Sequence, residues 1–186
     1  GMDVVASCQP VHLHTDMFVA EKKWGMERCR YGYAWKSMLR SGIKVQFGSD
    51  APVEHINPLL SFHAAIARQT PAGEPRDGWF PAERLTLEET LHAFTAVPAW
   101  VSRTEAQLGA LGIGRLADIT VFAEDLSTLA PERLCEARAS LPCVMPRSGC
   151  RPREEGVHLS RSALAGVTSR WIPSSTTSPE PATRSS

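Results

Sequence analysis

The sequence predicts an α/β fold in which two parallel β-strands are joined through a helix. The first observation is a short apolar run over residues 4–9, which contains the β-branched Val4 and Val5 and stops at Pro10. The second is a further predicted strand over residues 43–47. The third is the long segment between the two runs, because parallel strands need a crossover connection of this kind. The first of the two runs is continuous, which also predicts a strand that is buried on both faces.

The segment between these strands predicts a loop followed by a helix. Residues 10–25 are interpreted as a loop that leads away from the end of the first strand. Gly42 stands where a residue of left-handed conformation would end the helix. Apolar side chains recur before it at the spacing of one helical face, at Tyr31, Ala34, Trp35, Met38 and Leu39.

Two more helices are predicted after the second strand. Asn57-Pro58 begins one of them, because Asn is a good N-cap and Pro fits the first helical turn. A loop rich in Gly and Pro covers residues 70–84. Thr86 and Glu89 then form a capping box at the start of the next helix, which Pro98 should end or kink.

The last part of the chain changes in character twice. Residues 118–122 are rich in β-branched side chains and predict a strand, and residues 131–137 predict a short helix. From residue 141 Pro, Ser, Thr and Arg dominate, so we expect residues 141–186 to form a disordered tail. An abrupt change of this kind also suggests a frameshift in the gene.

Composition narrows the classes of function. The 186 residues include 20 basic and 20 acidic side chains, which gives no basic surface typical of nucleic-acid or membrane binding. No apolar run reaches the length of a membrane-spanning helix, and no signal peptide is recognised, so a cytoplasmic location is expected. The five cysteines are irregularly spaced and contain no Cys-x-x-Cys pair, which predicts reduced thiols.

The candidate chemistry lies where the two strands end. Asp50 directly follows the second strand, and His12 follows the first. In parallel α/β barrels catalytic groups collect at the carboxyl ends of the strands, and a carboxylate there can bind a divalent metal and accept a proton. The alternative is that Asp50 only caps the turn that follows it.

His12-Leu13-His14 offers a second metal-binding interpretation. Alternate residues of a strand point the same way, so a His-x-His pair on a strand can bind one metal. Pro10 argues against this interpretation, because it disturbs the strand geometry that the pair would need. His63 and His92 fall on predicted helices and are expected to be packing or surface residues.

Three motifs in order resemble the amidohydrolase superfamily, in its type-3 branch. Residues 6–12 with Asp16 resemble the end of that family's seventh barrel strand. Residues 48–53 resemble the end of its eighth strand, and residues 108–118 resemble the return of the chain to a small β-sandwich.

The resemblance implies a partial fold. It implies an α/β chain that contains strands seven and eight of a (β/α)8 TIM barrel with their helices, plus a remnant of the flanking composite β-sandwich. The implied division is barrel at residues 1–107, returning sandwich strand at residues 108–140, and tail at residues 141–186.

The resemblance also implies a function. It is the hydrolysis of a non-peptide, amide-like carbon–nitrogen bond in a small molecule, through water activated by a divalent metal, with zinc as the expected ion. Asp50 would be a metal ligand and the catalytic carboxylate, and His12 would contact substrate.

The family's other metal ligands are absent, and zinc needs about three protein ligands. The chain alone would then be an inactive fragment or a docking module that associates through its open barrel edge, including with a second copy. A flavodoxin-like binding module would need a Gly-rich phosphate loop after the first strand, which the sequence lacks.

Overall fold

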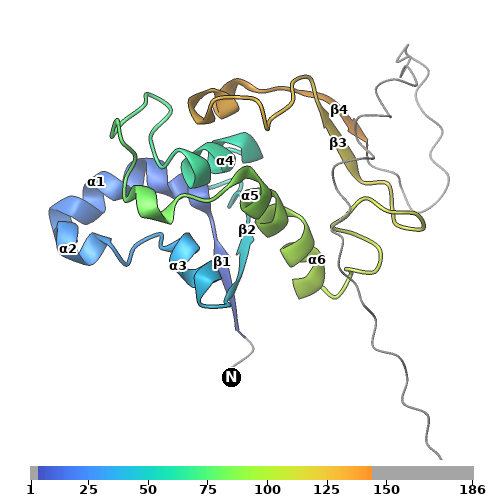
Figure 1. The fold of residues 1–186 in the computed structure, drawn as a ribbon, viewed down its shortest axis with the longest axis horizontal. Helices are drawn as coiled ribbons and strands as arrows, with labels where there is room; N and C mark the ends of the chain where they lie inside the picture. The colour runs from blue at the N-terminus through green and yellow to red at the C-terminus, as the bar shows by residue number, and fades with distance from the viewer. Residues whose placement is uncertain (1–3, 144–186) are drawn as a thin grey trace, which may run out of the picture. The chain divides into compact units, whose positions relative to one another are not determined.

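The computed structural model describes residues 4–143 (Figure 1). Four strands alternate with helical segments in this part of the chain. The elements in chain order are β1 (Val5–Cys8), η1 (Pro10–His12), α1 (Leu13–Trp24), α2 (Met26–Cys29), α3 (Trp35–Arg40), β2 (Lys44–Phe47), α4 (Pro58–Ile66), η2 (Pro81–Glu83), α5 (Leu87–Phe94), α6 (Ala96–Val101), β3 (Ile119–Phe122), η3 (Pro131–Glu136) and β4 (Ala139–Cys143).

The predicted parallel pair is present. β1 and β2 pair in parallel with Cys8 opposite Phe47, so the two strands end side by side. The prediction that the first strand is buried on both faces is wrong, because no residue of β1 is fully buried and Ser7 is exposed. Val45 and Phe47 are buried on one face of the pair, whereas Lys44 is exposed on the other. This alternation is typical of a strand whose sheet is covered mainly on one side, and α3, α5 and α6 pack against β2.

The loop predicted over residues 10–25 is wrong, because helix α1 occupies most of it. Pro10 does not end the ordered structure but opens the short 3₁₀ helix η1, where a missing N–H costs no hydrogen bond. Leu13, Met17 and Ala20 then recur at helical spacing and are all buried. The sequence therefore contained a helical signal that the proline obscured.

The helix predicted around residues 31–39 is shorter than expected. Within this range only α3, from Trp35 onward, is helical. Tyr33 has a positive φ of 53°, which separates α3 from the residues before Tyr33. The predicted end is confirmed. Gly42 has a φ of 78°, and the N–H groups of Gly42 and Ile43 donate to the carbonyls of Leu39 and Met38 in a Schellman motif.

Both predicted N-caps are confirmed. The Asn57 side chain accepts a hydrogen bond from the Leu59 N–H at 3.1 Å. Thr86 and Glu89 exchange the two hydrogen bonds of a capping box. The helix that they begin ends at Phe94, and Pro98 lies in the first turn of α6. The predicted interruption is therefore present as a break between two helices.

β3 and β4 form a separate antiparallel pair. β3 confirms the strand predicted at residues 118–122, and η3 confirms the predicted short helix, as a 3₁₀ helix. The predicted tail began at residue 141, but residues 141–143 belong to β4. The rest of the predicted tail, residues 144–186, lies outside the described residues.

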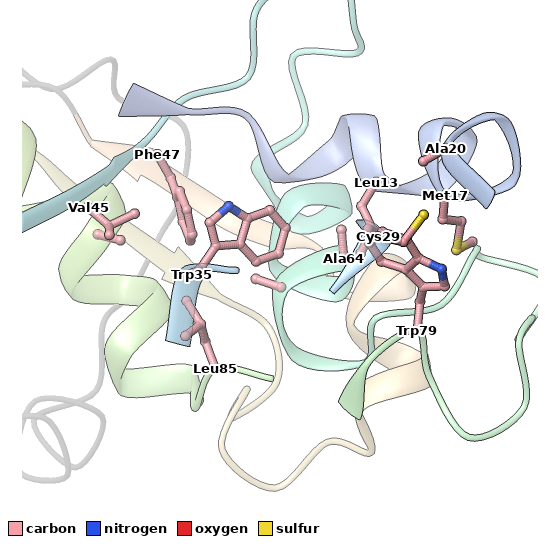
Figure 2. Close-up of a cluster of buried hydrophobic side chains, with 12 residues drawn as sticks. Leu13, Met17, Ala20, Cys29, Trp35, Val45, Phe47, Ala64, Trp79 and Leu85 are labelled. Atoms are coloured by element: carbon pink, nitrogen blue, oxygen red, sulfur yellow. The ribbon is translucent and has the colours of Figure 1, made fainter. Parts of the chain in front are cut away.

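The main core lies between β1–β2 and the helices, with Trp35 at its centre (Figure 2). The Trp35 indole meets the Phe47 ring edge-to-face at a centroid distance of 5.4 Å. Buried Arg68 stacks against Trp35 and Trp79, and its Nη1 donates to the Tyr33 carbonyl at 3.0 Å. Its guanidinium therefore connects three segments that are distant in the chain. A second cluster joins α4 to the segment around η3 and contains Leu59, Phe62, Leu126, Leu134 and Ala137.

The described residues form a mixed α/β arrangement with two two-stranded sheets, and these residues do not close a barrel. Within the same residues, no helix has both the length and the apolarity to cross a membrane.

Candidate functional site

Asp50 lies in a tight turn just past the end of β2. Its φ is 58°, a left-handed conformation that Asp tolerates better than most residues. The N–H groups of Val53 and Glu54 donate to the Asp50 carbonyl at 2.8 and 3.2 Å. Asp50 thus does cap the following turn, but through its backbone, which leaves the carboxylate available for another contact.

That contact is with His12. β1 ends beside β2, and η1 then places the His12 ring so that its Nε2 lies 3.3 Å from Oδ2 of Asp50. His12 Nε2 is shielded from solvent and makes no well-aligned hydrogen bond. The two atoms therefore meet as an ion-pair contact that forms when the imidazole is protonated. The Asp50 side chain keeps 43% of its surface exposed and so remains accessible.

The residues around Asp50 do not make up a complete metal site. Among residues 4–143, no group of three or more His, Cys, Asp or Glu side chains could hold a metal ion. Asp50 fits the role of one oxygen ligand, but a catalytic zinc takes about three protein ligands. A metal at this position would need ligands from polypeptide beyond the described residues.

Asp16, part of the first motif, has a local structural contact. It accepts a short hydrogen bond from the Tyr33 hydroxyl. Burial raises the pKa of Tyr33, and the bond to Asp16 raises it further. This hydrogen bond links α1 to the segment before α3, so the Asp16 carboxylate has a structural partner within the chain.

His14 and His63 form a second contact between distant residues. His14 Nε2 lies 3.3 Å from His63 Nδ1, and the ring centroids are 5.4 Å apart. Burial and the neighbouring His63 lower the pKa of His14 to about 4. Burial also lowers the pKa of His63, while Glu132 acts in the opposite direction. Both rings are therefore neutral near pH 7.

The sequence interpretation did not find this pair. His12 and His14 lie on η1 and α1 and not on a strand, so the His-x-His arrangement of a strand is absent there. His63 is buried with 1% of its surface exposed, as its expected packing role requires. Recognising helix α1 in the sequence would have placed His14 on a helical face, but nothing in the sequence places that face against α4.

Comparison with known families identifies residues 2–151 as matching the Amidohydrolase family profile. The matched range includes both strand ends and the β3–β4 pair. It also reaches beyond residue 118, where the last of the three motifs ends.

Curated relatives match parts of the chain. The protein LONG AFTER FAR-RED 3 of Arabidopsis thaliana is 36% identical over 122 residues, which is 65% of this chain and 21% of that protein. YtcJ of Bacillus subtilis is 28% identical over 72% of this chain and 25% of its own length. The N-substituted formamide deformylase of Arthrobacter pascens is 33% identical over 48% of this chain and 16% of its own length. The chain thus spans no more than about a quarter of these relatives.

A solved structure is also similar. An uncharacterized metal-dependent hydrolase from Pyrococcus horikoshii OT3 superposes with a TM-score of 0.57 at 26% identity. The match covers 69% of this chain and 26% of that structure. The family profile covers most of the chain, and the structural match agrees with it. The chain belongs to the amidohydrolase family, in its type-3 branch.

Proposed function

We propose that the chain is the C-terminal part of a metal-dependent amidohydrolase that hydrolyses an amide-like, non-peptide carbon–nitrogen bond in a small molecule. The contact between His12 and Asp50, at the carboxyl ends of two parallel strands, carries this proposal. β1 and β2 would be strands seven and eight of a TIM barrel, and residues 108–140 would return to a β-sandwich. A cytoplasmic location stays a prediction.

Asp50 is the residue that we assign to catalysis and to metal binding. Its carboxylate is accessible and its backbone is held by the turn that follows, which fixes the position of the side chain. A divalent metal, zinc by expectation, would supply Lewis acidity and an activated water when bound. The carboxylate itself would accept a proton and release it again.

His12 is the residue that we assign to the substrate side of the site. Its Nε2 faces the Asp50 carboxylate and can orient that group, while the exposed 29% of its side chain could contact a ligand. The name of the Arthrobacter pascens relative suggests N-substituted formamides as the first substrates to try.

A reconstituted enzyme tests the proposal. The 186-residue chain would replace the corresponding C-terminal segment of YtcJ, and the fusion would be assayed on N-substituted formamides and simple amides with and without a chelator. We expect chelator-sensitive hydrolysis, which Asp50→Asn lowers by at least about 10²-fold in kcat. Asp77→Asn, at an exposed aspartate, is the matched control. A fully active Asp50→Asn fusion contradicts the assignment.

A second candidate is a non-catalytic chain that docks on another polypeptide through an open strand edge. Two observations favour it: β1 and β2 each pair on one side only, and the described residues lack a three-ligand metal group. Turnover by the purified 186-residue chain, sensitive to Asp50→Asn, would refute this candidate.

A further inference from the structure

We propose that His14 and His63 form a two-nitrogen binding site for a borderline transition-metal cation such as Zn²⁺ or Cu²⁺, separate from Asp50. The facing atoms are Nε2 of His14 on α1 and Nδ1 of His63 on α4. This site does not depend on the proposed hydrolase function.

The separation of the two nitrogens is the first argument. Their distance is 3.3 Å, slightly beyond the roughly 2.7–3.2 Å of N–H···O hydrogen bonds. Two imidazole nitrogens bound to one tetrahedral zinc at about 2.0–2.1 Å would lie about 3.3–3.4 Å apart. The observed spacing, which also allows a hydrogen bond between the rings, therefore suits two ligands of one ion.

The state of the rings is the second argument. A metal ligand must offer a lone pair, so an imidazole that binds a metal must be neutral at that nitrogen. Burial lowers the pKa of both rings, to about 4 for His14, which keeps both neutral at pH 7. A cation can then bind without displacing a proton from an imidazolium.

Local charge is the third argument. The carboxylate of Glu132, on η3, acts on His63 in the direction that favours positive charge. η3 packs against α4, which keeps this carboxylate near the pair. Its negative charge stabilises a cation at the two rings, while the half-buried His14 leaves one side open for water to complete the coordination.

The structure fixes the spacing of the ligands. His63 is 1% exposed and packed within α4, so its ring is constrained. His14 lies on the first turn of α1, whose face carries the buried Leu13 and Met17. Two rings held on packed helices lose little freedom when they bind an ion, which favours binding by only two protein ligands.

Metal titration of the full chain tests the site. The chain would carry Asp50→Asn, which removes the metal ligand of the proposed hydrolase site. It would be stripped of metal with a chelator, dialysed and titrated with Zn²⁺ by calorimetry. We expect one equivalent to bind, and His14→Gln or His63→Gln to weaken binding by at least about tenfold, which is about 1.4 kcal/mol. His92→Gln is the matched control on an exposed helical histidine and should leave the affinity unchanged.

The electron paramagnetic resonance spectrum of bound Cu²⁺ gives a second readout that does not rely on a variant at the buried His63. The spectrum should show two imidazole nitrogens in the Asp50→Asn chain and one after His14→Gln. No binding, or binding that His14→Gln leaves unchanged, would mean that the two rings form only a hydrogen-bonded pair, and would overturn the proposal. An effect of His92→Gln equal to that of His14→Gln would overturn it as well.

Discussion

Nε2 of His12 lies 3.3 Å from Oδ2 of Asp50 because two parallel strands in register end side by side. The N–H of Gly48 donates to the Cys8 carbonyl at 3.1 Å and extends the strand pairing up to the two side chains. A contact between residues distant in the chain is thus produced by the local geometry of one β-α-β unit.

We expect His12 to position the Asp50 carboxylate in the reconstituted enzyme. His12→Ala should lower kcat/KM by about 10–100-fold, the range typical when a partner that orients a ligand is removed. His12→Gln keeps a polar group at this position and should recover part of the loss. His55→Ala, at an exposed histidine in the same turn region, serves as the control. Equal effects of His12→Ala and His55→Ala would show that the contact has no role.

The capping box of α5 gives a stability prediction. Thr86→Ala removes the hydroxyl that accepts from the Glu89 N–H at 3.1 Å, so the free energy of unfolding should fall by about 1 kcal/mol. Thr86→Ser keeps the hydroxyl and should change the stability little. Urea denaturation followed by circular dichroism measures both variants. A Thr86→Ser variant as unstable as Thr86→Ala would indicate that the methyl group, not the cap, matters.

Two glycines with left-handed backbone allow a matched comparison. A Cβ on Gly109 would lie 2.7 Å from the Ala99 Cβ and 2.9 Å from the Thr95 carbonyl, whereas a Cβ on Gly42 meets nothing within 4 Å. Gly42→Ala should therefore cost only the left-handed strain of about 1–2 kcal/mol. Gly109→Ala should cost about 1–3 kcal/mol more, because the contacts with the start and middle of α6 are overpacked. Denaturant titration of both variants checks the order, and equal losses would contradict it.

Trp35 is expected to dominate the stability of the main core. It is 1% exposed and contacts Phe47 and the Arg68 guanidinium. Trp35→Ala should lower the free energy of unfolding by about 3–5 kcal/mol. Trp24, with 57% of its surface exposed, provides the control, since Trp24→Ala should stay within about 0.5 kcal/mol of the unmodified chain. Similar losses for both variants would mean that the cluster in Figure 2 is not the cooperative core.

Cys135 gives a pH prediction. Burial and the charge of Glu136 raise the pKa of its thiol to about 11, above the value of about 8.5 for an unfolded cysteine. Because the folded-state pKa is raised, the contribution of this thiol to stability is complete below pH 8.5 and is lost as the pH rises toward 11.

Alkylation measures the same effect directly. Since only the thiolate reacts, iodoacetamide at pH 8 should modify Cys135 far more slowly in the folded chain than in denaturant. Peptide mass spectrometry follows the rate, and Glu136→Gln should increase it in the folded chain. A folded-state rate equal to that in denaturant would show that the thiol is not buried as described.

Much of the fold could be predicted because its signals are local. The caps at Asn57 and Thr86, the left-handed Gly42 and the two parallel strands each depend on a few neighbouring residues. Helix α1 was missed because Pro10 breaks a strand and equally well begins a helix. The burial of both faces of β1 was predicted wrongly because a continuous apolar run does not reveal how many layers cover it.

The candidate site also has features that the sequence predicted and one that only the structure shows. The order of the motifs determined the family and singled out Asp50 and His12, because each motif follows a strand end and strand ends of a parallel pair lie together. The sequence by itself therefore determined the family, the caps and the candidate carboxylate. Only the tertiary structure decided that His14 faces His63, because the packing of η1, next to the start of α1, against α4 depends on side-chain contacts between distant segments that no local pattern specifies.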